Sequence, residues 1–314
     1  LGGLLGKRGA DGCFVEFSYD PLRRLVTATN AHAHLQFEYN PLGQITRETQ
    51  NDAVVQYEHN LIGQRTGTIT PDGERIDYVY DAQSHLQQIF INGQLLTQHR
   101  FDELGQEVAR QQGALVSWYD YDPMGRLVRH QTGLAGNRTA VLGCRYGYDV
   151  MGNLALVDDF RQGQTRYLYD PADRLIQVEG LNPERFVHDP AGNLIGINQE
   201  SSGLVKGNRL VLLGDRHFTY DAAGNLVEER RGKDQKIITR YVYDSDNHLI
   251  RAETPRSVVN YSYDALGRRI VKETEQGEIH FVYDGARLLA ETEGERCKTY
   301  LFEPGRFRPL ARID

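Results

Sequence analysis

Aromatic and aliphatic residues alternate with polar ones along nearly the whole chain, and the pattern restarts about every 20 residues. Each restart carries an aromatic residue or histidine followed by an acid or its amide. The fourteen copies are Tyr19-Asp20, Tyr39-Asn40, His59-Asn60, Tyr80-Asp81, Phe101-Asp102, Tyr121-Asp122, Tyr148-Asp149, Tyr169-Asp170, His188-Asp189, Tyr220-Asp221, Tyr243-Asp244, Tyr263-Asp264, Tyr283-Asp284 and a decayed Phe302-Glu303. Most steps are 19 to 21 residues, with steps of 27 and 32 after Asp122 and Asp189. The chain is therefore a repeat array.

The residues after each acid have the chemistry of a tight turn. Asp and Asn accept a hydrogen bond from the backbone two residues on, Pro presets φ, and Gly accepts the left-handed φ that closes the turn. This predicts a type I turn followed by a β-bulge. The predicted turn residues are Asp20, Asp81, Asp122, Asp149, Asp170, Asp221, Asp244 and Asp264, together with Gly43, Gly125, Gly152, Gly192, Gly224 and Gly267.

Such a turn places each aromatic residue opposite an aliphatic one, as Tyr19 opposite Leu25, so that aromatic side chains share one face of a sheet. The predicted ladder consists of Tyr19, Tyr39, Tyr80, Tyr121, Tyr148, Tyr169, Tyr220, Tyr243, Tyr263 and Tyr283. The acid then faces the residue four positions on, as Asp20 faces Arg24 and Asp264 faces Arg268. We expect these ion pairs to be exposed and weak, at about 0 to 1 kcal/mol each.

Each repeat is thus a β-hairpin. An isolated hairpin is marginally stable in water, whereas hairpins side by side form a continuous sheet, and so long a sheet twists and curls. We predict an all-β fold in which residues 1–314 form one array, a long curled sheet that makes a spiral ribbon or hollow cocoon-like shell. The long steps predict insertions near 133–142 and 199–214 that leave the sheet and serve as partner contacts. A chain beginning with Leu beside a repeat is expected to be a fragment of a longer polypeptide.

Composition excludes several classes of function. The net charge is −7 and the calculated pI is near 5.8, which argues against a nucleic-acid partner. The three cysteines (Cys13, Cys144 and Cys297) are far apart, so neither a disulfide framework nor a zinc site is indicated. No apolar run approaches the roughly 20 residues that span a bilayer, so we expect no membrane insertion by this segment.

Candidate chemistry is scarce. The common nucleophile, phosphate-loop and dinucleotide motifs are absent from the sequence. His32 and His34 could share a strand face, but no third metal ligand is placed by spacing, and the adjacent pair Asp158-Asp159 is typical of a solvated turn. We therefore predict no catalytic, cofactor or metal site. A hydrolase on a β scaffold would require a cleft with converging carboxylates.

The unit Tyr119-Asp120-Tyr121-Asp122-Pro123-Met124-Gly125-Arg126-Leu127 and its counterpart Tyr261 to Arg268 resemble the Rhs or YD-repeat family over nearly the whole chain. The resemblance implies a bacterial polymorphic toxin, made in the cytoplasm and exported, whose repeats enclose a C-terminal toxic domain. It also implies contacts with the remaining core of the same polypeptide, with secretion-spike or toxin-complex proteins and with an immunity protein. The family's core-closing and self-cleavage motifs are absent here, so no cleavage or toxin residue is carried over.

Two functions from different classes follow. The first is a non-catalytic shell segment of an Rhs-type toxin. The alternative is a cell-surface adhesion or carbohydrate-binding YD-repeat module that uses exposed aromatic rings.

Overall fold

The computed structural model describes residues 5–9, 12, 14–137, 139–198 and 203–314. Cys13 and residues 199–202 of the second predicted insertion lie outside the described residues. Within the described part of the chain, the one helical element is the 3-10 turn η1 (Lys233–Gln235), and everything else regular is β-strand. The all-β prediction is confirmed. No helix in these described ranges has the length and apolarity needed to cross a bilayer.

The chain divides into two compact units. Unit 1 is Leu1–Ile76 with Phe218–Asp314, and unit 2 is Asp77–His217. The first strands are β1 (Gly6–Arg8), β2 (Phe14–Tyr19), β3 (Leu25–Thr29), β4 (His34–Tyr39), β5 (Ile45–Gln50), β6 (Ala53–His59), β7 (Arg65–Ile69) and β8 (Arg75–Tyr80). They continue as β9 (Leu86–Ile91), β10 (Gln94–Phe101), β11 (Glu107–Gln112), β12 (Leu115–Tyr121), β13 (Leu127–Leu134), β14 (Ala140–Tyr148), β15 (Leu154–Asp159), β16 (Gly163–Tyr169), β17 (Leu175–Glu179), β18 (Glu184–His188), β19 (Leu194–Ile197), β20 (Leu204–Lys206) and β21 (Arg209–Leu213). The remaining strands are β22 (Arg216–Tyr220), β23 (Leu226–Arg231), β24 (Ile237–Tyr243), β25 (Leu249–Glu253), β26 (Val258–Tyr263), β27 (Arg269–Thr274), β28 (Gly277–Asp284), β29 (Arg287–Glu293), β30 (Arg296–Phe302) and β31 (Pro309–Ile313).

Consecutive strands pair antiparallel within each unit. In unit 1, β2 to β7 pair in order, and so do β23 to β31. In unit 2, β9 to β18 do the same. Adjacent strands in such a meander need only short turns, which is why one repeat of about 20 residues supplies two strands and two turns.

The turn after Tyr19-Asp20 has the geometry predicted from the sequence. Tyr19 lies opposite Leu25, and the register shifts between Ser18 and Tyr19, as a bulge demands. The Asp20 carboxylate accepts backbone N–H groups from Leu22 and Arg24, both at 2.9 Å. Gly125 closes its own turn at a φ of 80°.

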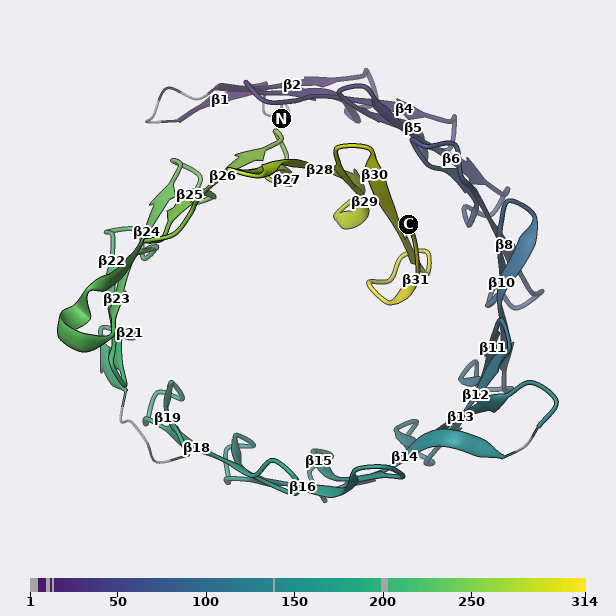
Figure 1. Ribbon diagram of the computed structural model, residues 1–314. Helices are drawn as coiled ribbons and strands as arrows, with labels where there is room; N and C mark the ends of the chain where they lie inside the picture. Colours follow the sequence, from purple (N-terminus) through teal and green to yellow (C-terminus); the bar gives the residue numbers. More distant parts are fainter. Residues whose placement is uncertain (1–4, 10–11, 13, 138, 199–202) are drawn as a thin grey trace. The chain divides into compact units, whose positions relative to one another are not determined.

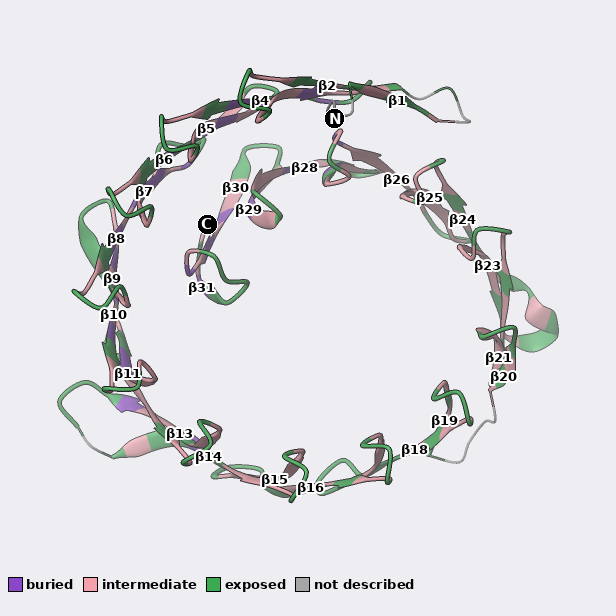
Figure 2. Cartoon of the chain, turned by 180° about the vertical axis from the view of Figure 1, so that it is seen from behind, coloured by how far each residue is buried: buried purple, intermediate pink, exposed green. Residues whose placement is uncertain are grey.

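The two halves of unit 1 form two layers. The N-terminal layer comprises β2 to β7, and the C-terminal layer comprises β24 to β30; Figure 1 shows β27 and β28 beside β2 to β5. One cluster of buried residues places Leu35 and Phe37 against Ile270, and another places Val55 and Tyr57 against Leu289. Figure 2 shows the buried residues of this region running along β4 to β7. The core of unit 1 therefore lies between the layers.

Within the described residues, part of each long step is paired strand, whereas the sequence pattern predicted segments that leave the sheet. Gly133 and Leu134 extend β13, and Ala140 to Leu142 begin β14, with Gly133 paired to Ala140. Residues 204–213 form a hairpin of β20 and β21. Insertion between two paired strands lengthens the ladder or adds a hairpin, because extra residues then keep their backbone hydrogen bonds.

We predict that Gly125→Val lowers the free energy of unfolding by about 1 to 3 kcal/mol, since a β-branched residue resists the left-handed φ of 80°. Gly125→Asn is the control, because Asn247 occupies the same turn position at a φ of 64°. Urea unfolding monitored by far-ultraviolet circular dichroism measures both. Equal stability of the Val variant and the parent would show that this turn position carries no strain.

Candidate functional site: the junctions between repeats

The predicted turn acids are spread over the junctions rather than gathered in one place, and each serves its own turn. Hydrogen bonds from the backbone and side chain of Arg126 hold the pKa of Asp122 below its ordinary value. The side-chain and backbone hydrogen bonds from Arg174 lower the pKa of Asp170 to about 2. These carboxylates are therefore ionised and already bonded, so that none is poised to transfer a proton near neutral pH.

Arginine four residues after the turn acid links one repeat to the next. Arg24 donates from Nε to Asp20 at 2.6 Å and from Nη1 to the backbone oxygen of Asn40 at 3.2 Å, and its guanidinium lies 4.7 Å from the centre of the Tyr39 ring. Arg174 likewise donates to Asp170 and to the backbone oxygen of Asp189. We call Arg24, Arg126, Arg174 and Arg268 the junction arginines.

Shorter side chains at the same position make related contacts. Asn153 bonds to Asp149 within its own turn and to Asp173 in the next turn, at 3.2 and 2.9 Å. Asn225 spans from Asp221 to Asn247 in the same way. In these repeats, the turn acid and the residue four positions on together connect one hairpin to the next.

Tyrosine hydroxyls link the repeats in the opposite direction. The hydroxyl of Tyr148 donates to the backbone oxygen of Leu127, at 2.8 Å, in the preceding hairpin. The same bond is made by Tyr39, Tyr121, Tyr169, Tyr263 and Tyr283, at 2.7 to 2.9 Å. All ten predicted ladder tyrosines are half-buried. Burial raises the pKa of Tyr39, Tyr169, Tyr243, Tyr263 and Tyr283.

The prediction that the Asp–Arg pairs are exposed is wrong for Asp264 and Arg268. The Arg268 side chain is 9% exposed and that of Asp264 is 0% exposed. The C-terminal layer of unit 1 brings Arg268 to Glu48 of the N-terminal layer, with Nη1 and Oε1 2.7 Å apart. Burial raises the pKa of Glu48 although Arg268 opposes this. Nothing in the repeat pattern predicts a contact between two residues so far apart in the sequence.

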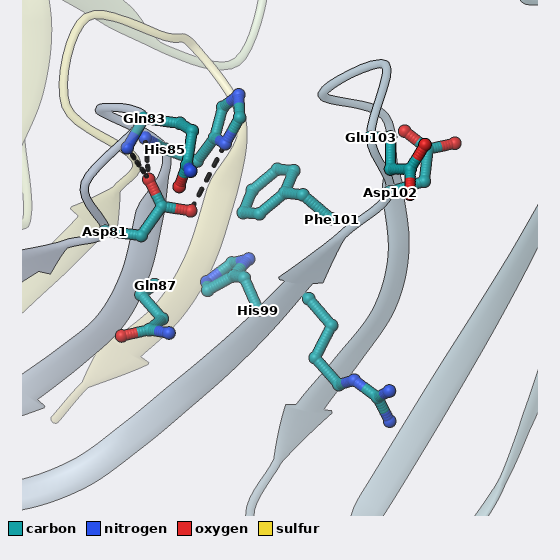
Figure 3. Close-up of a pocket in the computed structure, with 9 residues that line it drawn as sticks. Asp81, Gln83, His85, Gln87, His99, Phe101, Asp102 and Glu103 are labelled. Atoms are coloured by element: carbon teal, nitrogen blue, oxygen red, sulfur yellow. Dashed lines mark hydrogen bonds and ion pairs between the residues drawn. The ribbon is translucent and has the colours of Figure 1, made fainter.

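A cavity of about 530 Å³ opens beside the junction of Asp81 and His85 in unit 2 (Figure 3). The His85 ring stacks on Phe101 with their centres 4.8 Å apart, and Figure 3 shows Phe101 between His85 and His99. Asp81 accepts the backbone N–H groups of Gln83 and His85, both at 2.9 Å. Its carboxylate is therefore committed to the turn rather than to a ligand in the cavity.

A hydroxyl, an imidazole and a carboxylate lie in series behind this cavity. Thr97 Oγ1 is 2.9 Å from His99 Nε2, and His99 Nδ1 is 2.6 Å from Glu107 Oε1. However, Thr97 is fully buried and does not line the cavity, while Glu107 also accepts two bonds of 2.8 Å from Arg110. Burial acts to raise the pKa of Glu107, but the bonds from His99 and Arg110 outweigh it and lower the pKa to about 2. The arrangement is a buried structural network, because a substrate has no access to the hydroxyl.

The described residues contain no group of three or more side chains arranged to hold a metal ion. His34 hydrogen-bonds to Thr29 and Gln36.

Residues 134–288 match the family model described as Teneurin YD-shell. Double-stranded DNA deaminase toxin A of Burkholderia cenocepacia is 38% identical over 194 residues, which cover 59% of this chain and 13% of that protein. Toxin protein Tse5 of Pseudomonas aeruginosa is 29% identical over 236 residues, covering 61% of this chain and 18% of that protein. These matches identify an Rhs/YD-repeat shell region in the chain.

The crystal structure of TcdB2-TccC3-TEV is 15% identical to this shell region with a TM-score of 0.45, covering 93% of this chain and 17% of that one. The shell region spans less than a fifth of the length of the relatives described here.

Sequence reasoning paired the acids with the arginines but missed the onward contacts between repeats. The signal present in the sequence concerns the pair within each turn. Where the turn acid is replaced by an amide, at Asn40 and Asn60, the residue four positions on is Gln44 or Gln64, and the amide pairs bond directly. Joint changes of this kind indicate that the two side chains touch and match in charge.

We predict that Tyr148→Phe lowers the free energy of unfolding by about 1 kcal/mol, because it leaves the Leu127 carbonyl without its 2.8 Å donor while the ring stays in place. Tyr167→Phe is the control, since no hydroxyl partner of Tyr167 occurs among the described residues. Chemical denaturation of both variants gives the difference. A Tyr148→Phe variant as stable as the control would show that the backward hydroxyl bond does not stabilise the shell region.

The lowered pKa of Glu107, about 2, makes an acid-dependent contribution to stability. A carboxyl group whose pKa is lower in the folded state stabilises the fold above its unfolded pKa, near 4.3, and this contribution is lost as pH falls toward 2. We therefore expect the free energy of unfolding to fall between about pH 5 and pH 2, with Glu107 supplying on the order of 3 kcal/mol of that fall.

Glu107→Gln should reduce the fall in the free energy of unfolding between pH 5 and pH 2. Urea unfolding at several pH values from 2 to 6 measures this. Glu103→Gln, which alters an exposed carboxyl on the neighbouring turn, is the control. If the free energy of unfolding falls with pH equally in the parent and in Glu107→Gln, Glu107 does not make this contribution to stability.

Proposed function

We propose that the shell region is a non-catalytic part of the wall of an exported bacterial toxin, and that this wall encloses a C-terminal toxic domain of the same polypeptide. One observation carries the proposal. The repeated Asp, Arg and Tyr side chains form hydrogen bonds with their own turns and with the neighbouring hairpins, as Arg24 does with Asp20 and Asn40. Such residues build a wall and leave no converging polar groups for a reaction.

The relatives also support a shell that is separate from the toxic activity. One is named a DNA deaminase toxin and another a probable deoxyribonuclease, which are different reactions, yet both resemble this chain over about 60% of its length. A segment shared by toxins of different chemistry fits a common container better than a common catalyst. The proposal includes a longer polypeptide made in the cytoplasm and then exported, further core repeats, a delivery spike or toxin complex, and an immunity protein.

We also propose that residues 1–314 form one array. Both boundaries between the compact units fall inside strands, β8 and β22, which supports continuity of the ribbon. The hollow, curled shape remains part of this proposal.

The adhesion alternative requires aromatic rings with free polar edges. The ladder tyrosines that donate their hydroxyls to backbone carbonyls, such as Tyr148 and Tyr263, are half-buried and committed to the ribbon. This commitment favours the wall over a glycan-binding surface.

The test uses the parent polypeptide and the shell region alone. We expect the shell region expressed alone in bacteria to leave growth unchanged, and the toxic domain within the parent to resist limited proteolysis. Asp122→Ala combined with Arg126→Ala should open one junction and speed cleavage of the toxic domain severalfold, while Glu103→Gln should not. A toxic domain cut equally fast in all three proteins, or glycan-array binding by the shell region, would overturn the proposal.

A further inference from the structure

The two layers of unit 1 meet in a regular register. Asn30 donates from its side-chain amide to the backbone oxygen of Tyr263, at 2.8 Å, and Gln50 donates to the backbone oxygen of Tyr283, at 2.6 Å. Each pair is 233 residues apart in the sequence. One repeat of the N-terminal layer therefore lies over one repeat of the C-terminal layer, and the next repeat lies over the next.

Apolar contacts alone do not specify this register. Leu35 and Val55 occupy the same position in successive repeats, both are fully buried, and they contact Ile270 and Leu289, which also lie about one repeat apart. Sliding one layer by a single repeat would place similar aliphatic side chains together again. Repeats with a matching pattern tolerate such slips unless another group penalises them.

The charged residues between the layers do differ from repeat to repeat. Glu48 is 1% exposed, and the equivalent residues one repeat before and after it are Ala28 and Thr68, which are also buried. Glu48 accepts from Arg268 Nη1 at 2.7 Å and from Gln50 Nε2 at 3.0 Å. Gln50 also accepts the backbone N–H of Tyr283 at 3.0 Å.

We infer that Glu48, Gln50 and Arg268, the interlayer cluster, determine which repeat of one layer seats on which repeat of the other. A slip by one repeat in either direction would leave Arg268 facing Ala28 or Thr68, neither of which carries a charge. A buried guanidinium that loses one of its two carboxylate partners is strongly disfavoured, whereas the apolar contacts hardly change. The cluster thus selects one register among several that hydrophobic burial alone would accept.

Cysteine cross-linking of the full chain tests this inference, in a background with Cys13, Cys144 and Cys297 replaced by Ser. Lys7 pairs with Asp246, the third residue of its turn, so Lys7→Cys with Asp246→Cys reports the native register. Leu266 and Ala223 occupy the same position in the next and previous turns. Lys7→Cys with Leu266→Cys, or with Ala223→Cys, therefore reports a slip in either direction when treated with a short bismaleimide.

In the parent, we expect only the pair at 7 and 246 to cross-link efficiently. Glu48→Leu combined with Gln50→Leu leaves Arg268 without an interlayer partner in every register, so the slipped cross-links should rise about tenfold. Thr68→Val is the matched control, because Thr68 is buried at the equivalent position and its hydroxyl has no hydrogen-bond partner among the described atoms. It should leave the cross-linking ratios unchanged.

A folded double variant that still cross-links only at 7 and 246 would overturn the inference, as would an equal rise in slipped products for Thr68→Val. If the double variant fails to fold, Glu48→Gln replaces it, because this change keeps the side-chain shape and removes only the charge. The slipped products should then rise in the same direction by a smaller factor. Unchanged ratios in a folded Glu48→Gln variant would refute a role for the charge. None of these outcomes depends on the cargo proposed above.

Discussion

The whole ribbon depends on the hydrogen bonds that each turn acid makes to its own backbone. One oxygen of Asp20, Asp122 or Asp170 accepts two N–H groups that the bulged turn leaves without a strand partner. An unpaired backbone group of this kind costs about 1 to 3 kcal/mol when removed from water. Because the carboxylate is fixed by those two bonds, its second oxygen has one direction left, and the residue four positions on is held there. From that position, an arginine such as Arg24 or Arg174 also bonds to the next hairpin and fixes its place.

Two kinds of contact act on different length scales. Along the ribbon, the junction arginines and tyrosine hydroxyls join neighbours about 20 residues apart and recur with small variations. Between the layers of unit 1, the charged contacts join residues more than 200 apart and occur once each, as Glu48 with Arg268 and Arg65 with Asp284. Contacts along the ribbon can be identical because every junction joins two similar hairpins. Contacts that distinguish one repeat from another cannot be identical, because identical contacts would form equally well in a slipped register.

The sequence predicted what is local. The strand period, the turn acid and the left-handed third position are properties of a few adjacent residues, so the hairpins and the pairing of Tyr19 with Leu25 could be anticipated. The buried state of Asp264 and Arg268 could not, because it depends on Glu48 lying in another layer. From the sequence alone, Glu48 would be predicted to be an exposed residue of a strand with alternating polar and apolar positions. The insertions were mistaken for loops because a longer spacing in sequence does not reveal whether the added residues pair with each other.

The presence of two side-chain bonds at one junction has a mechanical consequence. An arginine such as Arg24 holds the following hairpin, whereas a tyrosine such as Tyr148 holds the preceding one. A pulling force that detaches a hairpin from either end of the ribbon must therefore break a side-chain bond as well as the strand ladder. Arg24 and Tyr39 bond across the same junction, so two side-chain contacts share the load there with the backbone hydrogen bonds of the ladder. Loss of one of these contacts leaves the other to hold the two hairpins together.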